Sequence, residues 1–233
     1  MIGWRDESGT RHGGSLFEAF AALARGEAWS FSALRPHQRE PWHAFTVQVA
    51  ALALIRAGTD TLPETEDAWR HLLRGLTPDH PTAWDLVVDD WTQPALLQPP
   101  VVSRSDYKAV ETPDLIDMVL TAKNHDVKRE RIASASEEEW LFALVTLQTA
   151  EGDRGISPPN SRYFGISRMN KGFGSRMTFG IRGVGGAAGA FKRDVMLLLA
   201  DASARNNRRD GDSLLWLMPW DGTESVRFDK LDE

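Results

Sequence analysis

The chain of 233 residues contains no cysteine, which excludes disulfide bonds and thiolate catalysis and is compatible with a reducing cytoplasm. It also lacks any run of about 18 apolar residues, the length that a membrane-spanning helix needs. The N-terminal sequence MIGWRDESG has none of the apolar stretch of a secretory signal. These absences predict a cytoplasmic protein that is neither secreted nor inserted in a membrane.

Sequence signatures of catalysis are missing as well. There is no G-x-S-x-G nucleophile motif, no G-x-x-x-x-G-K-[ST] phosphate loop and no carboxylate cluster beside a base. His37, Glu40 and His43 follow the order H-x-x-E-x-x-H rather than H-E-x-x-H, and Pro41 interrupts them. We therefore expect no metal site there, and local hydrogen bonds for both histidines near a helix start. An enzyme is therefore not excluded by the residues, but no set of residues in the sequence indicates one, and no cofactor is expected.

Positive charge is concentrated in one stretch of an acidic chain. The whole chain has 27 Lys and Arg against 33 Asp and Glu. Residues Arg154–Arg193, here called the Gly/Arg-rich segment, hold six arginines, two lysines and nine glycines but no Asp or Glu. The other residues keep 19 basic and 33 acidic side chains, so they carry a net −14 while the segment carries +8. A confined positive stretch of this kind indicates an anion-binding surface.

The composition of the Gly/Arg-rich segment suits a nucleic acid. Glycines let backbone amides approach a ligand closely, and Tyr163, Phe164, Phe173 and Phe179 are interleaved with the positive charges. Together these residue types can contact phosphates and stack on bases. The alternative interpretation is an ordinary glycine-rich loop whose arginines form a solvated rim.

A second basic cluster has the sequence TAKNHDVKRER at residues 121–131. Its basic members are Lys123, His125, Lys128, Arg129 and Arg131, weakly diluted by Asp126 and Glu130. A loop or frayed helix with such side chains can contact phosphates or an unstacked base. The alternative, which the pattern alone favours, is a charged face exposed to solvent.

Residue periodicity predicts a mixed α+β fold in a single domain of residues 1–233, with a mostly helical N-terminal half, short strands and a Gly/Arg-rich loop region. Ile2–Arg5 has the pattern of a strand that ends in a turn, and Ser15 with Glu18 begins a helix that ends at Gly26. Further helices are expected over residues 36–57, 63–74 and 82–91, from 113 onward, over 136–150, and from 189 to about 205. Strands are expected over residues 160–167, 177–182 and 214–220.

Residues Gly183–Ala188 match the loose dinucleotide-binding pattern G-x-G-x-x-A. The strand expected over 177–182 precedes them and a helix follows, so a nucleotide-cofactor protein that uses Gly183–Gly189 is an alternative function. The acidic residue that this pattern requires about 20 positions on falls near Ala202, inside the expected helix. No strand follows in time to complete a βαβ unit.

Six short motifs occur in a fixed order along nearly the whole chain. They are RPHQREPWHAF at Arg35–Phe45, AALAL at Ala50–Leu54, LQPP at Leu97–Pro100, TAKNHD at Thr121–Asp126, GFG at Gly172–Gly174 and LLWLMPWDG at Leu214–Gly222. In this order the set resembles the large subunit of the type I-E CRISPR Cascade complex, the CasA family. The resemblance implies a CasA N-terminal-domain-like fold and a binding subunit rather than an enzyme.

The resemblance also implies partners and site residues. A CasA-like subunit binds the other Cascade subunits and the crRNA, recognises the protospacer-adjacent motif of target double-stranded DNA, helps open the duplex and recruits a helicase-nuclease. The family's minor-groove loop is matched here by Gly172, Phe173 and Gly174. Glycines suit such a loop, because a narrow groove accepts a backbone without side chains. Around that loop, the phosphate contacts are expected from Arg168, Lys171 and Arg176. The loop at the crRNA 5′ end and the adjoining backbone subunit is expected at Lys123, Asn124, His125, Lys128 and Arg131.

The chain departs from the family at its C-terminal end. The family continues with a strand-separating wedge, a motif-contacting lysine and a helical bundle, and none of these can be assigned here. Two alternatives follow: the chain is the N-terminal part of a longer protein, or it is complete and strand opening comes from another subunit or is absent. Besides the cofactor interpretation, a purely structural assembly subunit remains an alternative, with basic loops that meet only RNA or other subunits.

Overall fold

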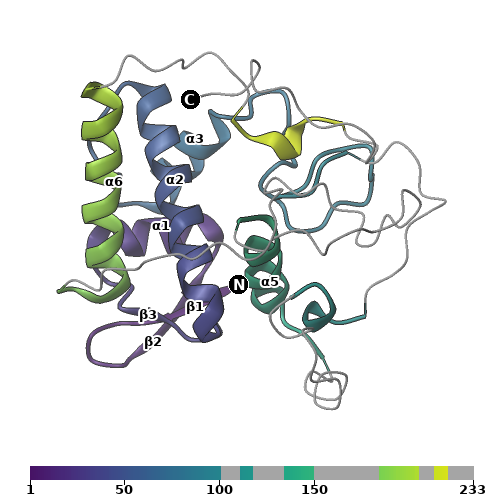
Figure 1. Ribbon diagram of the computed structural model, residues 1–233, viewed down its shortest axis with the longest axis horizontal. Coiled ribbons are helices and arrows are strands. Elements are labelled where there is room, and N and C mark those ends of the chain that lie inside the picture. Colours follow the sequence, from purple (N-terminus) through teal and green to yellow (C-terminus); the bar gives the residue numbers. More distant parts are fainter. Residues whose placement is uncertain (101–110, 118–133, 150–183, 205–212, 220–233) are drawn as a thin grey trace. The chain divides into compact units, whose positions relative to one another are not determined.

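The computed structural model describes residues 1–100, 111–117, 134–149, 184–204 and 213–219. Within these ranges, five α-helices and a small three-stranded antiparallel sheet form a mixed α+β fold, as the sequence predicts (Figure 1). The helices are α1 Leu16–Arg25, α2 Arg39–Ala57, α3 Glu66–Arg74, α5 Glu137–Thr149 and α6 Gly186–Ala204. The strands are β1 Ile2–Arg5, β2 Arg11–Gly14 and β3 Ser30–Phe31, and the 3-10 turns are η1 Pro36–Gln38, η2 Pro113–Leu115 and η4 Leu215–Leu217. None of the helices in the described ranges is long and apolar enough to cross a membrane.

The chain divides into two compact units. The described residues of the first unit fall within Met1–Pro78, Ser136–Phe142 and Thr178–Asn206. Those of the second unit fall within Asp79–Ala135, Ala143–Met177 and Asn207–Glu233. The boundary lies inside α5, so the first unit takes the beginning of this helix and the second unit takes its remainder.

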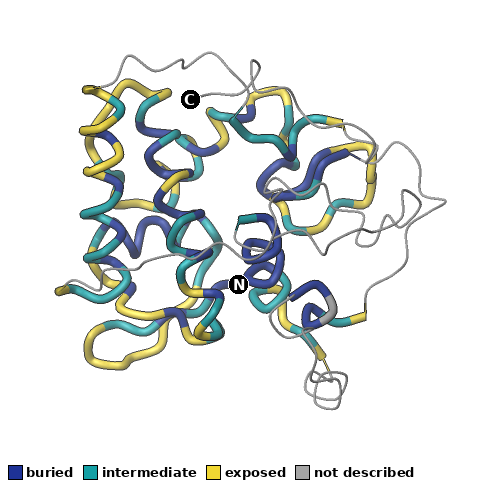
Figure 2. The backbone as a smooth tube through the Cα atoms, in the orientation of Figure 1, coloured by how far each residue is buried: buried dark blue, intermediate teal, exposed yellow. Residues whose placement is uncertain are grey.

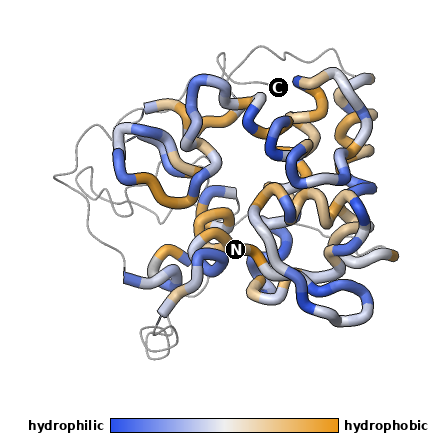
Figure 3. The backbone as a smooth tube through the Cα atoms, turned by 180° about the vertical axis from the view of Figure 1, so that it is seen from behind, coloured by the Kyte–Doolittle hydropathy of each residue, from blue (hydrophilic) through white to orange (hydrophobic). Residues whose placement is uncertain are grey.

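The sheet of the first unit has β1 at its centre, paired antiparallel with β2 on one side and β3 on the other. Ile2 and Trp4 of β1 are buried while Gly3 and Arg5 are half-buried, which is the alternation expected of a strand with one covered face. The turn between β1 and β2 is exposed in Figure 2 and hydrophilic in Figure 3. The predicted strand at Ile2–Arg5 is therefore confirmed.

Helix ends in the first unit follow the capping residues of the sequence. The Ser15 hydroxyl accepts a hydrogen bond from the Glu18 amide at 3.2 Å, and α1 ends at Gly26 in the left-handed region, with φ 89°. Gly58 ends α2 in the same way, with φ 67°. At α5, expected over 136–150, the Ser136 amide donates to the Glu139 carboxylate at 2.8 Å and the Glu139 amide donates to the Ser136 hydroxyl at 3.4 Å, which forms a capping box.

Two aromatic clusters form the core of the first unit, where α1 packs on α3 and α6, and α2 packs on α3 and α6. In the first cluster, the Trp69 ring centroid lies 5.0 Å from that of Phe20 and 6.4 Å from that of Phe191. In the second, the Trp42 ring centroid lies 5.4 Å from Phe31 and 5.0 Å from Phe142. All these rings are buried, and each burial stabilises the fold by roughly 2 to 3 kcal/mol.

Three expected helices of the first unit differ in detail. The α3 helix begins at Glu66 rather than near Pro63, because the Thr65 hydroxyl caps it by accepting from the Ala68 amide. The α2 helix buries residues on more than one side, among them Trp42, Thr46 and Val47, and leaves Leu52 half-buried. Contacts with both α3 and α6 explain this, since they cover more than one side of α2. The α6 helix begins at Gly186, three residues before the expected position.

The described part of the second unit consists of turns and the second half of α5. Residues 82–91, expected to be helical, form turns and bends instead. Their backbone groups close a loop: the Leu96 amide donates to the Asp85 carbonyl at 2.8 Å, and the Thr82 hydroxyl donates to the Pro94 carbonyl at 2.8 Å. Two adjacent β-branched residues, Val87 and Val88, together with the acidic side chains, disfavour a helix here.

A tight turn at Ala95–Gln98 follows this loop. The two end residues exchange backbone hydrogen bonds of 3.0 and 2.9 Å, and Leu97 inside the turn has φ 57° although it is not a glycine. The buried amide of Gln148 in α5 donates to the Leu97 carbonyl at 2.9 Å. This hydrogen bond holds a backbone conformation that costs a leucine roughly 1 to 2 kcal/mol.

Two further expectations in the second unit are corrected. Residues 215–217 form the 3-10 turn η4 where part of a strand was expected. The Trp216 indole is buried, donates to the Ala83 carbonyl at 3.2 Å and lies edge-on to Trp84, and these contacts hold the turn in place. The helix expected to start at Pro113 begins as the 3-10 turn η2, and its continuation past residue 117 lies outside the described residues.

Candidate nucleic-acid interface

The residues predicted to bind DNA and RNA lie outside the described part of the chain. For DNA they are Gly172, Phe173, Gly174, Arg168, Lys171 and Arg176, and for the crRNA loop they are Lys123, Asn124, His125, Lys128 and Arg131. The strands expected at 160–167 and 177–182 lie outside it too. What the structure does describe is the C-terminal end of the Gly/Arg-rich segment, from Val184 to Arg193, where it forms the start of α6.

The start of α6 is bonded to the protein's own backbone. The Ala187 amide donates to the Trp29 carbonyl at 2.9 Å, and the Ala188 amide donates to the Ala28 carbonyl at 2.9 Å. A third amide, that of Gly189, donates to the Gly185 carbonyl at 2.9 Å. Helix N-terminal amides of this kind are the groups that a dinucleotide-binding turn offers to a pyrophosphate. Here protein carbonyls occupy them.

The glycines of this turn serve helix packing. Gly185 and Gly186 have φ of 97° and 61°, which few other residues adopt. A β-carbon on Gly186 would lie 2.6 Å from the Trp29 carbonyl oxygen and 2.7 Å from its indole ring. The strands that the structure describes pair antiparallel, so they supply no parallel βαβ unit. Within the dinucleotide-like pattern, the glycine at position 186 is therefore explained by close contact with Trp29.

Just beyond this turn, an ion-pair cluster joins α6 to α2. The Asp194 carboxylate lies 2.8 Å from Nε2 of His43 and accepts hydrogen bonds from Arg193 at 2.6 and 2.8 Å. The pKa of Asp194 lies below its usual range, chiefly because of the hydrogen bond from Arg193, to which His43 adds. The same contact raises the pKa of Arg193. One of the positive charges counted in the Gly/Arg-rich segment is therefore already paired with a carboxylate.

The position of His43 corrects the expectation of a local hydrogen bond near the helix start. Its imidazole bonds to a residue 151 positions away. The sequence offered no signal for this pairing beyond the fact that Asp194 is the first acid after the Gly/Arg-rich segment. Among the described residues, no three His, Asp or Glu side chains lie together as metal ligands would.

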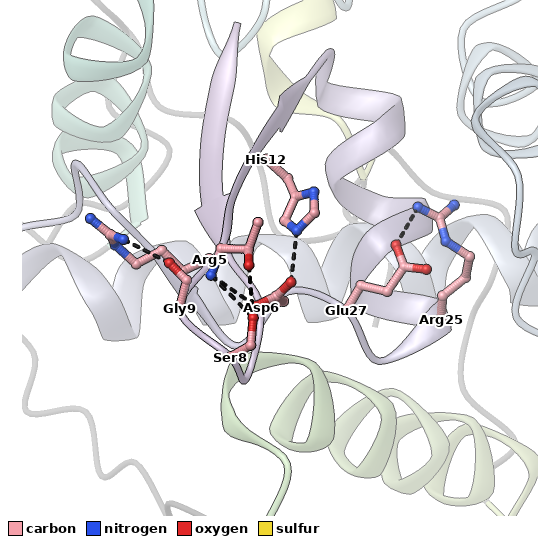
Figure 4. Close-up of polar contacts among 8 residues, drawn as sticks. Arg5, Asp6, Ser8, Gly9, His12, Arg25 and Glu27 are labelled. Carbon is pink, nitrogen blue, oxygen red and sulfur yellow. Dashed lines mark hydrogen bonds and ion pairs between the residues drawn. The ribbon is translucent and has the colours of Figure 1, made fainter.

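A polar cluster occupies the turn between β1 and β2 (Figure 4). The Asp6 carboxylate accepts from the Ser8 hydroxyl at 2.6 Å and lies 2.9 Å from Nε2 of His12. These contacts lower the pKa of Asp6 to about 2, with the bond from Ser8 as the largest cause. The carboxylate lies between the hydroxyl and the imidazole, whereas an activated serine needs the imidazole in the middle. The cluster stabilises the turn and does not form a nucleophile–base pair.

Carboxylates also neutralise other arginines of the first unit. Arg25 donates to Glu27 at 2.7 Å (Figure 4). It also donates to Glu18 at 2.6 Å, and the pKa of Arg25 is raised, chiefly by the bond to Glu27. Arg70 donates to Glu66 and to Asp67 on α3. These clusters offer no surplus of positive charge to a polyanion. In the sequence, the surplus of basic over acidic residues lies in the Gly/Arg-rich segment.

No protein-family model matches the chain, and no match was found among curated proteins or solved structures.

Proposed function

We propose that this chain acts as a CasA-like, non-catalytic subunit of a crRNA-guided surveillance complex. In that role it recognises the protospacer-adjacent motif in target double-stranded DNA in the cytoplasm and helps to recruit the helicase-nuclease of the type I system. The observation that carries the proposal is the ordered set of family-like motifs, which extends from Arg35–Phe45 to Leu214–Gly222.

Charge and composition support the same role. A segment with +8 inside a chain of net −6 is suited to the phosphates of a duplex, and its glycines are suited to a narrow groove. In the proposal, Gly172, Phe173 and Gly174 approach the minor groove, and Arg168, Lys171 and Arg176 neutralise phosphates around them. Lys123, Asn124, His125, Lys128 and Arg131 meet the crRNA end and the neighbouring subunit.

The described structure weakens the cofactor alternative. A dinucleotide site would need free amides at the start of α6, but those of Ala187 and Ala188 are bonded to the carbonyls of Trp29 and Ala28. Three of the family-like motifs contain residues that the structure buries. These residues are Trp42 in the first unit and Leu97 and Trp216 in the second. In the proposal they hold the fold, while the residues that contact nucleic acid belong to the basic stretches.

The proposal is tested with the chain assembled with its neighbouring subunits and crRNA. Binding to short duplexes with varied flanking trinucleotides is measured at two salt concentrations. We expect flank-dependent affinity, lost when Gly172 and Gly174 are replaced by bulky residues, and a salt dependence that reports several phosphate contacts. Binding that is indifferent to flank, salt and substitution removes the motif-reader role. Retained assembly would then leave a purely structural subunit.

A further inference from the structure

Exposed apolar side chains gather on the second half of α6. Across the part of the chain that the structure describes, eight large apolar side chains are exposed, and three of them are consecutive on this helix. They are Met196, Leu197 and Leu198, with exposed fractions of 45%, 61% and 38%. Single exposed apolar side chains are ordinary on a protein surface, but several together on one element are typical of an interaction site.

Leu197 lies at the centre of this exposed face. The buried residues Phe191, Val195 and Leu199 occupy the side of α6 that packs on α1 and α2. Because two residues turn an α-helix by about 200°, Leu197 points away from both Val195 and Leu199. In Figure 1, α6 lies at the outer edge of the helices of the first unit, beside α2. The side of α6 centred on Leu197 is therefore directed away from the first unit.

Two opposite charges flank Leu197 at equal spacing on the same face. Arg193 lies four residues before it and Asp201 four residues after it, so each is about 6 Å away along the helix axis. The Arg193 side chain is 36% exposed although it donates to Asp194, and Asp201 is exposed. The face thus carries a basic end, an apolar centre and an acidic end.

The other two charged side chains of α6 are directed at the first unit itself. Lys192 Nζ lies over the end of α1, 3.4 Å from where a β-carbon on Gly26 would be. The Asp194 carboxylate lies 2.8 Å from Nε2 of His43 on α2. The charge pattern of the exposed face is therefore set by Arg193 and Asp201.

We propose that this face of α6 is a homodimer interface in which two copies of the chain pair antiparallel about Leu197. A twofold axis brings the same surface of both copies together. Antiparallel pairing places Arg193 of each copy level with Asp201 of the other, so two opposite-charge contacts flank the apolar centre. Parallel pairing would oppose Arg193 to Arg193 and Asp201 to Asp201, which is repulsive. The inference is independent of the proposed function.

The first test is sedimentation velocity of the full chain over a range of concentrations. We expect a monomer–dimer equilibrium in the micromolar range, because a single pair of helices is a small interface. Leu197→Glu brings two carboxylates together at the axis and should weaken the dimer at least roughly tenfold. Val87→Glu, at a 78% exposed position of the second unit, is the control and should leave it unchanged. A wild type that stays monomeric throughout overturns the inference.

The second test exchanges the charges and examines the pairing itself. Arg193→Asp and Asp201→Arg each oppose like charges at both contacts, so each variant alone should dimerise roughly tenfold more weakly than the wild type. An equimolar mixture restores opposite charges at both contacts and should dimerise like the wild type. A defect in the fold of either variant would not be repaired by mixing. If the mixture stays monomeric while the wild type dimerises, the antiparallel pairing is wrong.

Circular dichroism of each variant checks that the helices are retained. Should Leu197→Glu fail to fold, the mixture of Arg193→Asp and Asp201→Arg still decides, because the rescue depends on the contact between copies. A monomeric wild type whose assembly with the neighbouring subunits is lost in Leu197→Glu would assign the face to another partner. That result would also overturn the homodimer.

Discussion

The imidazole of His43 lies 2.8 Å from the carboxylate of Asp194 and joins α2 to α6 across 151 positions of the chain. Both side chains are about a quarter exposed, at 27% and 26%, so water screens the pair only partly. Arg193 donates to the same carboxylate. The pair therefore links the residue that follows the Gly/Arg-rich segment to α2, the longest helix of the N-terminal half.

Asp194→Asn should make the free energy of unfolding of the first unit less dependent on pH in the acidic range. The pKa of Asp194 is depressed in the folded protein, chiefly by Arg193, so its stabilising effect is present above the unfolded value near 3.8 and is lost as the pH falls through the folded pKa. We expect the wild type to exceed the variant by about 1 kcal/mol at pH 7, with the difference shrinking below about pH 4. Chemical denaturation across this pH range measures it, and a difference independent of pH contradicts the prediction.

Ser8→Ala should raise the pKa of Asp6 more than His12→Ala does. The hydrogen bond from Ser8 is the largest cause of the low value of about 2, and His12 comes second. A carbon-detected NMR titration of the Asp6 carboxylate gives all three midpoints. A larger shift in His12→Ala would show that charge on the imidazole, and not the hydroxyl, dominates the turn.

Trp69→Ala should destabilise the first unit by about 3 to 5 kcal/mol. The side chain is fully buried, donates to the Pro63 carbonyl at 2.7 Å and contacts Phe20 and Phe191, so its removal leaves a cavity between three helices. Trp91→Ala is the control, because that indole is 41% exposed; its cost should stay below about 1 kcal/mol. Equal losses, measured by denaturant unfolding, would contradict the assignment of Trp69 to the core.

Gln148→Ala should destabilise the second unit, because the Leu97 carbonyl loses the amide that donates to it at 2.9 Å. A buried carbonyl without this partner costs about 1 to 3 kcal/mol, and Leu97 depends on it to keep its left-handed φ of 57°. Gln48→Ala on the exposed side of α2 serves as the control and should change little. The free energies of unfolding of both variants are measured, and equal losses would contradict the prediction.

Replacing Arg168, Lys171 or Arg176 by alanine should weaken duplex binding similarly for all flanking sequences. Each loss should reduce the slope of log affinity against log salt by about one, because in the proposed function each side chain makes one phosphate contact. Gly172→Val should instead reduce discrimination between flanks with the slope unchanged. If the alanine variants changed flank preference and left the slope intact, the assignment of these side chains to phosphates would be wrong.

Local signals in the sequence predicted helix ends well. Ser15 and Gly26 bound α1, Gly58 ends α2, and Ser136 with Glu139 begins α5, because capping hydrogen bonds form between residues only a few positions apart. Where the outcome depended on distant partners, prediction failed. The segment expected to be helical over 82–91 became turns, in which the carbonyls of Asp85 and Leu86 accept hydrogen bonds from Leu96 and Gln98.

At the candidate site, too, the sequence predicts the local features but not the long-range contacts. The sequence alone establishes that positive charge and glycine are concentrated in residues 154–193, and that Gly183–Ala188 match a cofactor pattern. It could not tell whether the amides after Gly185 face a ligand or a carbonyl, since Trp29 is more than 150 positions away in the chain. The hydrogen bonds of Ala187 and Ala188 answer that question.

By itself, then, the sequence determined the mixed α+β class, the capped ends of the helices and the separation of charge, because each depends on neighbouring residues or on composition. Only the tertiary structure decided that Gly186 packs on Trp29, that His43 binds Asp194 and that Gln148 holds the turn at Leu97. The physical reason is that burial and long-range hydrogen bonds select partners by proximity in space, which no local pattern records.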